Sequence, residues 1–127
     1  MTQPDDGRPA DAIGPSDPED LKIITLAKAA RARTQARQGA AVRDTDGRTY
    51  AAVDVELGPV ALSAITVATA MAVSSGAQGL EAVALAAESR PTEEDLAVVR
   101  ALPGTGVVVW FANPKGEVQG MVEVDDR

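Results

Sequence analysis

Two carboxylates, Asp54 and Glu56, stand two positions apart just after an apolar segment, and they are the residues best suited to hold a small ligand. Carboxylate oxygens accept hydrogen bonds from hydroxyl groups, so the pair could contact a ribose or another polyol. Carboxylates at a strand end also commonly remain solvated or cap a neighbouring backbone group. The residue types alone leave both roles open.

A second set of polar residues precedes two predicted helices. Ser63 could serve as a nucleophile, but the chain has no histidine and no lysine in a recognisable motif, so we interpret it as a helix-start residue. Thr92 is followed by Glu93, Glu94 and Asp95, which could collect a hard cation. A hydroxyl followed by acids also suits the first turn of a helix, where the dipole favours negative charge. We therefore predict a helix start there rather than a metal site.

Cysteine and histidine are both absent from the 127 residues. The chain can therefore have no disulfide, no thiol nucleophile, no histidine base and no Cys or His metal ligand. We expect neither a metal nor any other cofactor.

The charge of the chain is acidic but unevenly distributed. A net charge of −7 argues against general affinity for nucleic acid or anionic membrane. Seven of the twelve basic residues nevertheless fall between positions 22 and 48, where they could form a positive face that binds RNA or a phosphate. No aromatic residues are interleaved for base stacking, so a solvated face is the preferred interpretation. The seven are Lys22, Lys28, Arg31, Arg33, Arg37, Arg43 and Arg48.

An uncharged segment, Leu57 to Leu80, must organise the elements around it. Its composition predicts a central helix over Val60–Ser75, opened by Gly58-Pro59 and buried on most of its surface. Its glycines and many small polar residues make it a poor membrane span. With no secretion signal at the N-terminus, we expect a cytoplasmic, soluble protein.

The remaining pattern predicts one α/β domain over residues 18–127 behind a disordered acidic, Pro-rich tail over 1–17. Because the chain has few aromatic residues, its core should consist of small side chains. The element order αββαβαββ predicts a mixed sheet with helices on its faces. We expect helices at 18–34 (apolar stripe Ile23, Leu26, Ala27, Ala30), 60–75 and 92–102 (stripe Leu96, Val99, Leu102), a hairpin over 40–55, buried strands at 80–87 and 107–111, and an edge strand at 118–124.

Several strings between residues 20 and 124 resemble the small, homotetrameric type of cytidine deaminase. Gln38-Gly-Ala-Ala-Val42 is similar to the family's first strand, Asp46-Gly47 to its hairpin turn, and Ala112-Asn-Pro-Lys-Gly-Glu-Val118 to its closing strand pair. The resemblance implies a three-layer α/β/α fold around a mixed five-stranded sheet.

The same resemblance implies that the family's chemistry is missing. In the family, a Cys-Ala-Glu or His-Ala-Glu string and a Pro-Cys-x-x-Cys string supply three zinc ligands and a proton-shuttling glutamate. Here the first string becomes Ser63-Ala64-Ile65, and the second becomes Pro91-Thr92-Glu-Glu-Asp95. Ala36 replaces an aromatic that holds the pyrimidine.

The family's ribose-binding Asn-x-Glu-Asn string is only partly retained. Glu56 keeps the glutamate, whereas Asp54 and Leu57 replace the two asparagines. We therefore predict a catalytically inactive relative that acts as an oligomeric scaffold or interaction module. The alternatives are a nucleoside or small-ligand binder that uses Asp54 and Glu56, and, less favoured, an RNA-associated protein that uses residues 22–48. We expect a homodimer or homotetramer, because the family's Ala-rich central helices pack against each other; a partner protein is left open, and no membrane is expected.

Overall fold

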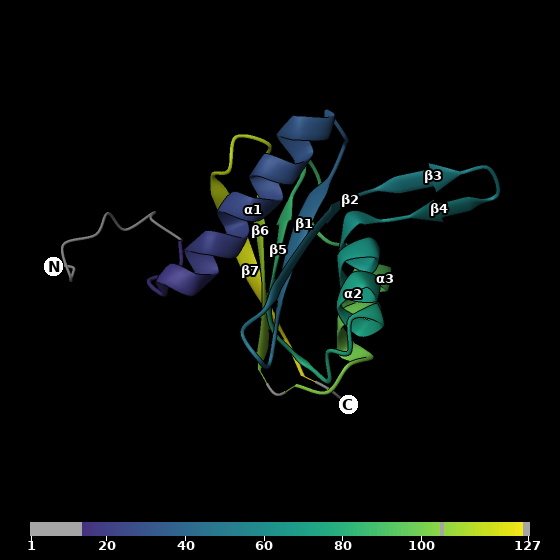
Figure 1. Ribbon diagram of the computed structural model, residues 1–127. Coiled ribbons are helices and arrows are strands. Elements are labelled where there is room, and N and C mark those ends of the chain that lie inside the picture. Colours follow the sequence, from purple (N-terminus) through teal and green to yellow (C-terminus); the bar gives the residue numbers. More distant parts are fainter. Residues whose placement is uncertain (1–13, 105, 126–127) are drawn as a thin grey trace, which may run out of the picture.

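The computed structural model describes residues 14–104 and 106–125, so most of the predicted tail lies outside the described residues. Five strands form a sheet in the order β2-β1-β5-β6-β7, with α1 against one face and α2 and α3 against the other (Figure 1). The predicted three-layer α/β/α fold with a mixed five-stranded sheet is therefore confirmed. The helices are α1 (Pro18–Thr34), α2 (Ala64–Ser74) and α3 (Glu93–Arg100); the strands are β1 (Gly39–Asp44), β2 (Thr49–Val53), β3 (Val55–Leu57), β4 (Val60–Leu62), β5 (Leu80–Ala86), β6 (Val107–Ala112) and β7 (Val118–Val124).

The directions of the strands follow from their connections. β1 is antiparallel to both β2 and β5, whereas β5 and β6, which are joined through α3, run parallel. β7 returns antiparallel to β6 and forms one edge of the sheet, as its partial alternation predicts. The carboxyl end of β5 thus lies beside the start of β1, where the pocket described below opens.

Helix α1 begins and ends as its sequence predicts. The Asp17 side chain accepts a hydrogen bond from the backbone N–H of Glu19 at 2.9 Å, and Pro18 occupies the first turn. The buried stripe is Ile23, Ile24, Ala27 and Ala30, so Ile24 takes the place predicted for Leu26, which is half-buried. Gly39 of β1 lies so close to α1 that a Cβ there would be 2.8 Å from the Arg31 backbone nitrogen.

Two cores of small side chains lie on the two faces of the sheet. One lies between the sheet and the α2–α3 layer and includes Val42, Ile65, Leu85 and Val109, all at most 1% exposed. The other lies under α1 and is mostly alanine: Ala27, Ala41, Ala82, Ala84, Ala86 and Ala112 surround Ile23 and Ile24. This composition confirms the expectation of a small-residue core, and it lets α1 approach the sheet closely.

The central helix is shorter than predicted. Val60–Leu62 is not helical but forms strand β4, which pairs with β3 in a separate two-stranded hairpin that projects from the body (Figure 1). Gly58, with φ of +58°, and Pro59 make the hairpin turn instead of opening the helix. The predicted second strand over 49–55 is likewise interrupted at Asp54. Helix α2 starts one residue after Ser63 and is buried on one side, whereas Met71 and Val73 are exposed.

One of the seven basic residues between 22 and 48 does not contribute to a positive face. Arg43 is buried between α1 and the sheet, where its guanidinium pairs with Asp20 at 3.0 Å and Glu81 at 2.9 Å. Trp110 Nε1 donates to the same Asp20 carboxylate at 3.1 Å. Burial lowers the pKa of Arg43, but its hydrogen bonds with Glu81 and Asp20 outweigh this effect and raise the pKa overall. The residue is a cation of the interior, not of the surface.

The predicted hairpin of β1 and β2 is confirmed, and the buried Asp44 side chain accepts hydrogen bonds that hold its turn. Its Oδ1 accepts hydrogen bonds from the backbone N–H groups of Asp46 and Arg48, and its Oδ2 accepts one from the Tyr50 hydroxyl, all at 2.9 Å. Burial raises the pKa of Asp44, but these hydrogen bonds to the carboxylate outweigh it, so the pKa lies below its usual 3.8.

Replacing Asp44 with asparagine is expected to reduce the folding equilibrium constant roughly tenfold at neutral pH, because a charged acceptor of three hydrogen bonds is lost. A lowered folded-state pKa contributes stability above the unfolded-state pKa, and this contribution disappears as the pH falls through the folded value. Urea unfolding at pH 7 and again below pH 3.8 should therefore show the difference between wild type and variant shrinking in acid. Asp46→Asn, at an exposed residue of the same turn, is the control; an equal pH-dependent loss there would contradict the assignment.

No helix among residues 14–104 and 106–125 is both long and apolar enough to cross a membrane.

Candidate functional site

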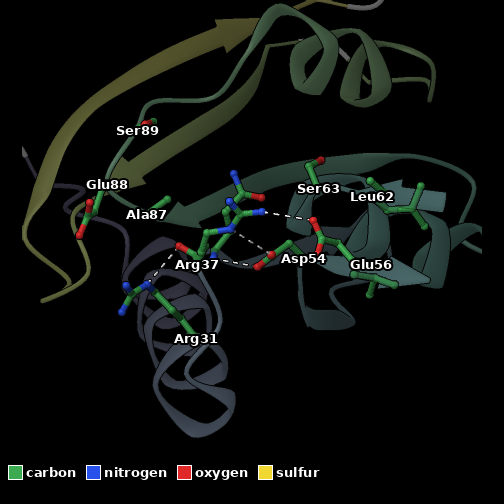
Figure 2. Close-up of a pocket in the computed structure, with 12 residues that line it drawn as sticks. Arg31, Arg37, Asp54, Glu56, Leu62, Ser63, Ala87, Glu88 and Ser89 are labelled. Carbon is green, nitrogen blue, oxygen red and sulfur yellow. Dashed lines mark hydrogen bonds and ion pairs between the residues drawn. The ribbon is translucent and has the colours of Figure 1, made fainter. Parts of the chain in front are cut away.

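A pocket of about 480 Å³ opens at the end of the sheet where β2 and β5 finish and α2 begins. It is open to solvent and its wall carries charges of both signs (Figure 2). The lining residues come from α1, the loop before β1, the β2–β3 junction, β4 and the segment after β5: Arg31, Arg37, Gln38, Asp54, Val55, Glu56, Ala61, Leu62, Ser63, Ala87, Glu88 and Ser89.

The two candidate carboxylates lie together on this wall. Asp54 interrupts the strand between β2 and β3, and its Oδ1 accepts a hydrogen bond from the Gln38 backbone N–H at 2.9 Å. Its side chain is 19% exposed, whereas that of Glu56 is 72% exposed. Asp54 thus caps a neighbouring backbone group, one of the two roles left open by the sequence, and it also lines the pocket. Contact with a polyol stays a prediction.

Arg37 contacts both carboxylates (Figure 2). Its Nη2 is 3.6 Å from Glu56 Oε2, and its Nε is 4.0 Å from Asp54 Oδ2. Arg31 Nε donates to the Arg37 carbonyl oxygen at 3.2 Å and so orders this loop. The Arg37 side chain is 82% exposed, so its contacts with the two carboxylates are largely screened by solvent.

Gln38 joins the pocket wall to the first turn of α2. Its Oε1 accepts a hydrogen bond from the Ala64 backbone N–H at 3.0 Å, one of the donors that a helix start leaves without an internal partner. The sequence did not indicate Gln38 as a site residue, and it indicated Arg37 only as part of a basic segment, not as a partner of Asp54 and Glu56. Their partners lie 16 to 26 positions away along the chain, and no local motif indicates such contacts.

The three residues at the family's metal-ligand positions converge at one place. Ser63 is the N-cap of α2, and its hydroxyl donates to Asp95 Oδ1 at 2.6 Å. Thr92 is the N-cap of α3: its backbone N–H donates to Asp95 Oδ2 at 3.0 Å, and its hydroxyl accepts from the Asp95 N–H at 3.1 Å. Ser63 and Thr92 therefore start helices, as their residue types indicate. Glu93 and Glu94 point to solvent, while Asp95 is 3% exposed.

This arrangement does not fit the zinc that the resemblance implies. The three positions offer two neutral hydroxyls and one carboxylate, and both oxygens of that carboxylate already accept hydrogen bonds. Zinc sites normally use three or four Cys, His or carboxylate ligands. Across the described residues, no group of three or more potential ligand side chains is placed to hold a metal ion. Ile65, at the position of the proton shuttle, is 0% exposed within the core.

The remaining sequence candidates are spread over the surface. Arg31 is half-buried at the pocket, Arg33 is exposed on α1, and Arg48 pairs with Asp46 in the β1–β2 turn at 3.4 Å. Arg43 is buried and so is not part of any positive face. RNA binding by this segment stays a prediction.

Comparison with known proteins agrees with this fold. A family model described as cytidine deaminase-like matches residues 16–116. The cytidine deaminase of Burkholderia pseudomallei superposes with a TM-score of 0.70 at 23% identity, covering 80% of this chain and 90% of that one. The Mycobacterium leprae enzyme gives 0.60 at 22% identity over 80% and 90%, and that of Mycobacterium tuberculosis gives 0.60 at 22% over 69% and 80%. At these identities the structural likeness supports the fold alone. A comparison with curated protein sequences finds no match.

Proposed function

The chain belongs to the cytidine deaminase-like family, and from this premise we propose that it is a catalytically inactive member that acts as an oligomeric scaffold or interaction module. The support for this proposal is the set of residues that occupy the three metal-ligand positions. Ser63 and Thr92 are each hydrogen-bonded to Asp95, and the aliphatic Ile65 stands where the proton shuttle would be. A hydrocarbon side chain can neither accept nor donate a proton. The attack of hydroxide on a nucleobase would therefore have no general acid or general base at this position.

Purified protein is therefore expected to contain far less than about one zinc per chain and to release no ammonia from cytidine. Metal content can be measured by inductively coupled plasma mass spectrometry after expression in zinc-supplemented medium. Ammonia release should be followed beside the Mycobacterium tuberculosis cytidine deaminase as a positive control. Stoichiometric zinc together with turnover of cytidine would overturn the proposal.

An exposed apolar surface supports the scaffold part of the proposal. It consists of hairpin residues Leu57, Val60 and Leu62, which the β3–β4 pairing puts on one side of the hairpin and which are 38–68% exposed; we call it the apolar hairpin face. A two-stranded hairpin is at best marginally stable alone in water. The segment from Leu57 to Leu80 carries no charge, so two copies could meet here in spite of the net charge of −7. We propose that this face contacts a second copy of the chain.

A second candidate function, binding of a nucleoside or similar polyol, is favoured by the pocket itself. Asp54 and Glu56 line a volume large enough for such a ligand, and Ser63 and Ser89 add hydroxyls to the wall. If this function operates, cytidine, uridine or ribose should raise the unfolding temperature, and Glu56→Ala should abolish the shift. Glu94→Ala, at an exposed residue outside the pocket, is the matched control and should keep it. No shift with any of the three ligands would leave the scaffold function alone.

A further inference from the structure

We propose that Ser63, Thr92 and Asp95 form a metal-free clamp that joins the N-terminal ends of α2 and α3. The linking contact is the 2.6 Å hydrogen bond from the Ser63 hydroxyl to Asp95 Oδ1, which connects residues 32 positions apart on two different helices. These side chains do not fit the zinc that the family implies. Instead, hydrogen bonds join the two helix starts at the place where the family's zinc would lie.

Asp95 is the centre of the clamp. Its carboxylate is buried, and it accepts one hydrogen bond from each helix start: the Ser63 hydroxyl at α2 and the Thr92 backbone N–H at α3. The N-terminal turn of a helix leaves backbone N–H groups without an internal partner, so a carboxylate that faces two helix starts meets favourably oriented donors. A buried carboxylate would otherwise be costly to remove from water.

Each of the two helix caps is complete within its own helix without the hydrogen bond from Ser63 to Asp95. Ser63 already accepts a hydrogen bond from the Thr66 N–H at 3.2 Å within α2, and Thr92 accepts one from the Asp95 N–H within α3. If each cap acted alone, a change at Ser63 would affect only α2. The Ser63 hydroxyl lies 2.6 Å from Asp95 Oδ1 and 3.0 Å from Thr66 Oγ1, so we assign its proton to the nearer, carboxylate acceptor. We therefore expect the two helix starts to be coupled, and the wall of the pocket at Ser63 to be held by α3.

The first test is hydrogen exchange in the full-length protein. Ser63→Ala should accelerate exchange of the Asp95 and Leu96 amides at the start of α3 about tenfold, although the substitution lies on α2. Ser74→Ala, at an exposed serine in the last turn of α2, is the control and should leave those amides unchanged. Unchanged exchange at α3 in Ser63→Ala would show two independent caps and overturn the clamp.

The second test is a double-mutant cycle. Ser63→Ala and Asp95→Asn should each lower the folding equilibrium constant roughly 10- to 100-fold, and the double variant should lose clearly less than the product of the two. Additive losses would contradict the clamp. A third measurement needs no variant: unfolding of the wild type should be the same in EDTA and in added zinc, and a zinc-dependent rise in unfolding temperature would show that a metal, not hydrogen bonds, joins the helices.

Discussion

Replacing Arg43 with methionine is expected to lower the free energy of unfolding by about 3–5 kcal/mol, the largest effect of any single substitution considered. The guanidinium is 10% exposed and its partner Asp20 is 13% exposed, so removal of the cation leaves a buried carboxylate without its counter-charge. Methionine fills much of the same volume, which separates the loss of charge from the loss of packing. Urea unfolding at pH 7 measures the change.

The matched control is Arg48→Met. Arg48 also pairs with an aspartate, at 3.4 Å from Asp46, but both side chains are more than 60% exposed. An exposed pair contributes about 0–1 kcal/mol, so this variant should stay close to wild type. Equal losses in the two variants would show that burial does not determine the effect. Replacing Asp20, Arg43 and Glu81 together by apolar residues should restore part of the stability, because no unpaired charge then remains in the interior.

Substituting aspartate at Leu57 and Val60 is expected to prevent the self-association that we propose. Both positions lie on the apolar hairpin face and are 68% and 43% exposed in the single chain, so the substitutions should not disturb the monomer fold. Placing two charges in each half of an apolar interface should weaken association by at least about 100-fold, since each charge would have to leave water. Light scattering coupled to gel filtration over a range of concentrations measures the mass.

Leu21→Asp provides the control for this experiment. Leu21 is 46% exposed in the first turn of α1, away from the hairpin, and an acid there is compatible with the helix start. This variant should keep the wild-type mass. A wild-type protein that stays monomeric at the highest concentrations, or a control that dissociates equally, would contradict self-association through the apolar hairpin face.

The fold could be predicted where local signals were strong. Asp17-Pro18 and the stripe behind it located α1 to the residue, and the Asp-Gly turn located the β1–β2 hairpin, because caps and turns act over a few residues. The β3–β4 hairpin was missed. Val60–Leu62 is a short apolar run directly before an apolar helix, and periodicity cannot tell a strand from a helix over so few residues. The missing charges in that stretch were interpreted as burial, whereas much of the surface is exposed.

The site could be predicted only in part, for the same reason. The motif resemblance placed Ser63, Thr92 and Asp95 at equivalent positions, and the structure brings them together. The residue types did not reveal that Asp95 accepts hydrogen bonds from both helix starts, or that Arg37 contacts both Asp54 and Glu56. These contacts depend on how the layers pack. A sequence pattern describes one element at a time, and tertiary pairing across 16 to 32 positions leaves no periodic trace in it.

The pairing of β1 with β5 has a consequence for how the chain reaches its native state. Asp44 of β1 meets Leu80 of β5, so closing this pair encloses β2, the β3–β4 hairpin and α2 in one long loop. The β1–β2 hairpin can form quickly from local contacts, whereas the central strand β5 pairs with β1 only after this long loop closes, which is slow. Until then β5 lacks β1 as a neighbour. Newly made chains are therefore open to edge-to-edge pairing with one another through this apolar strand until β1 joins it.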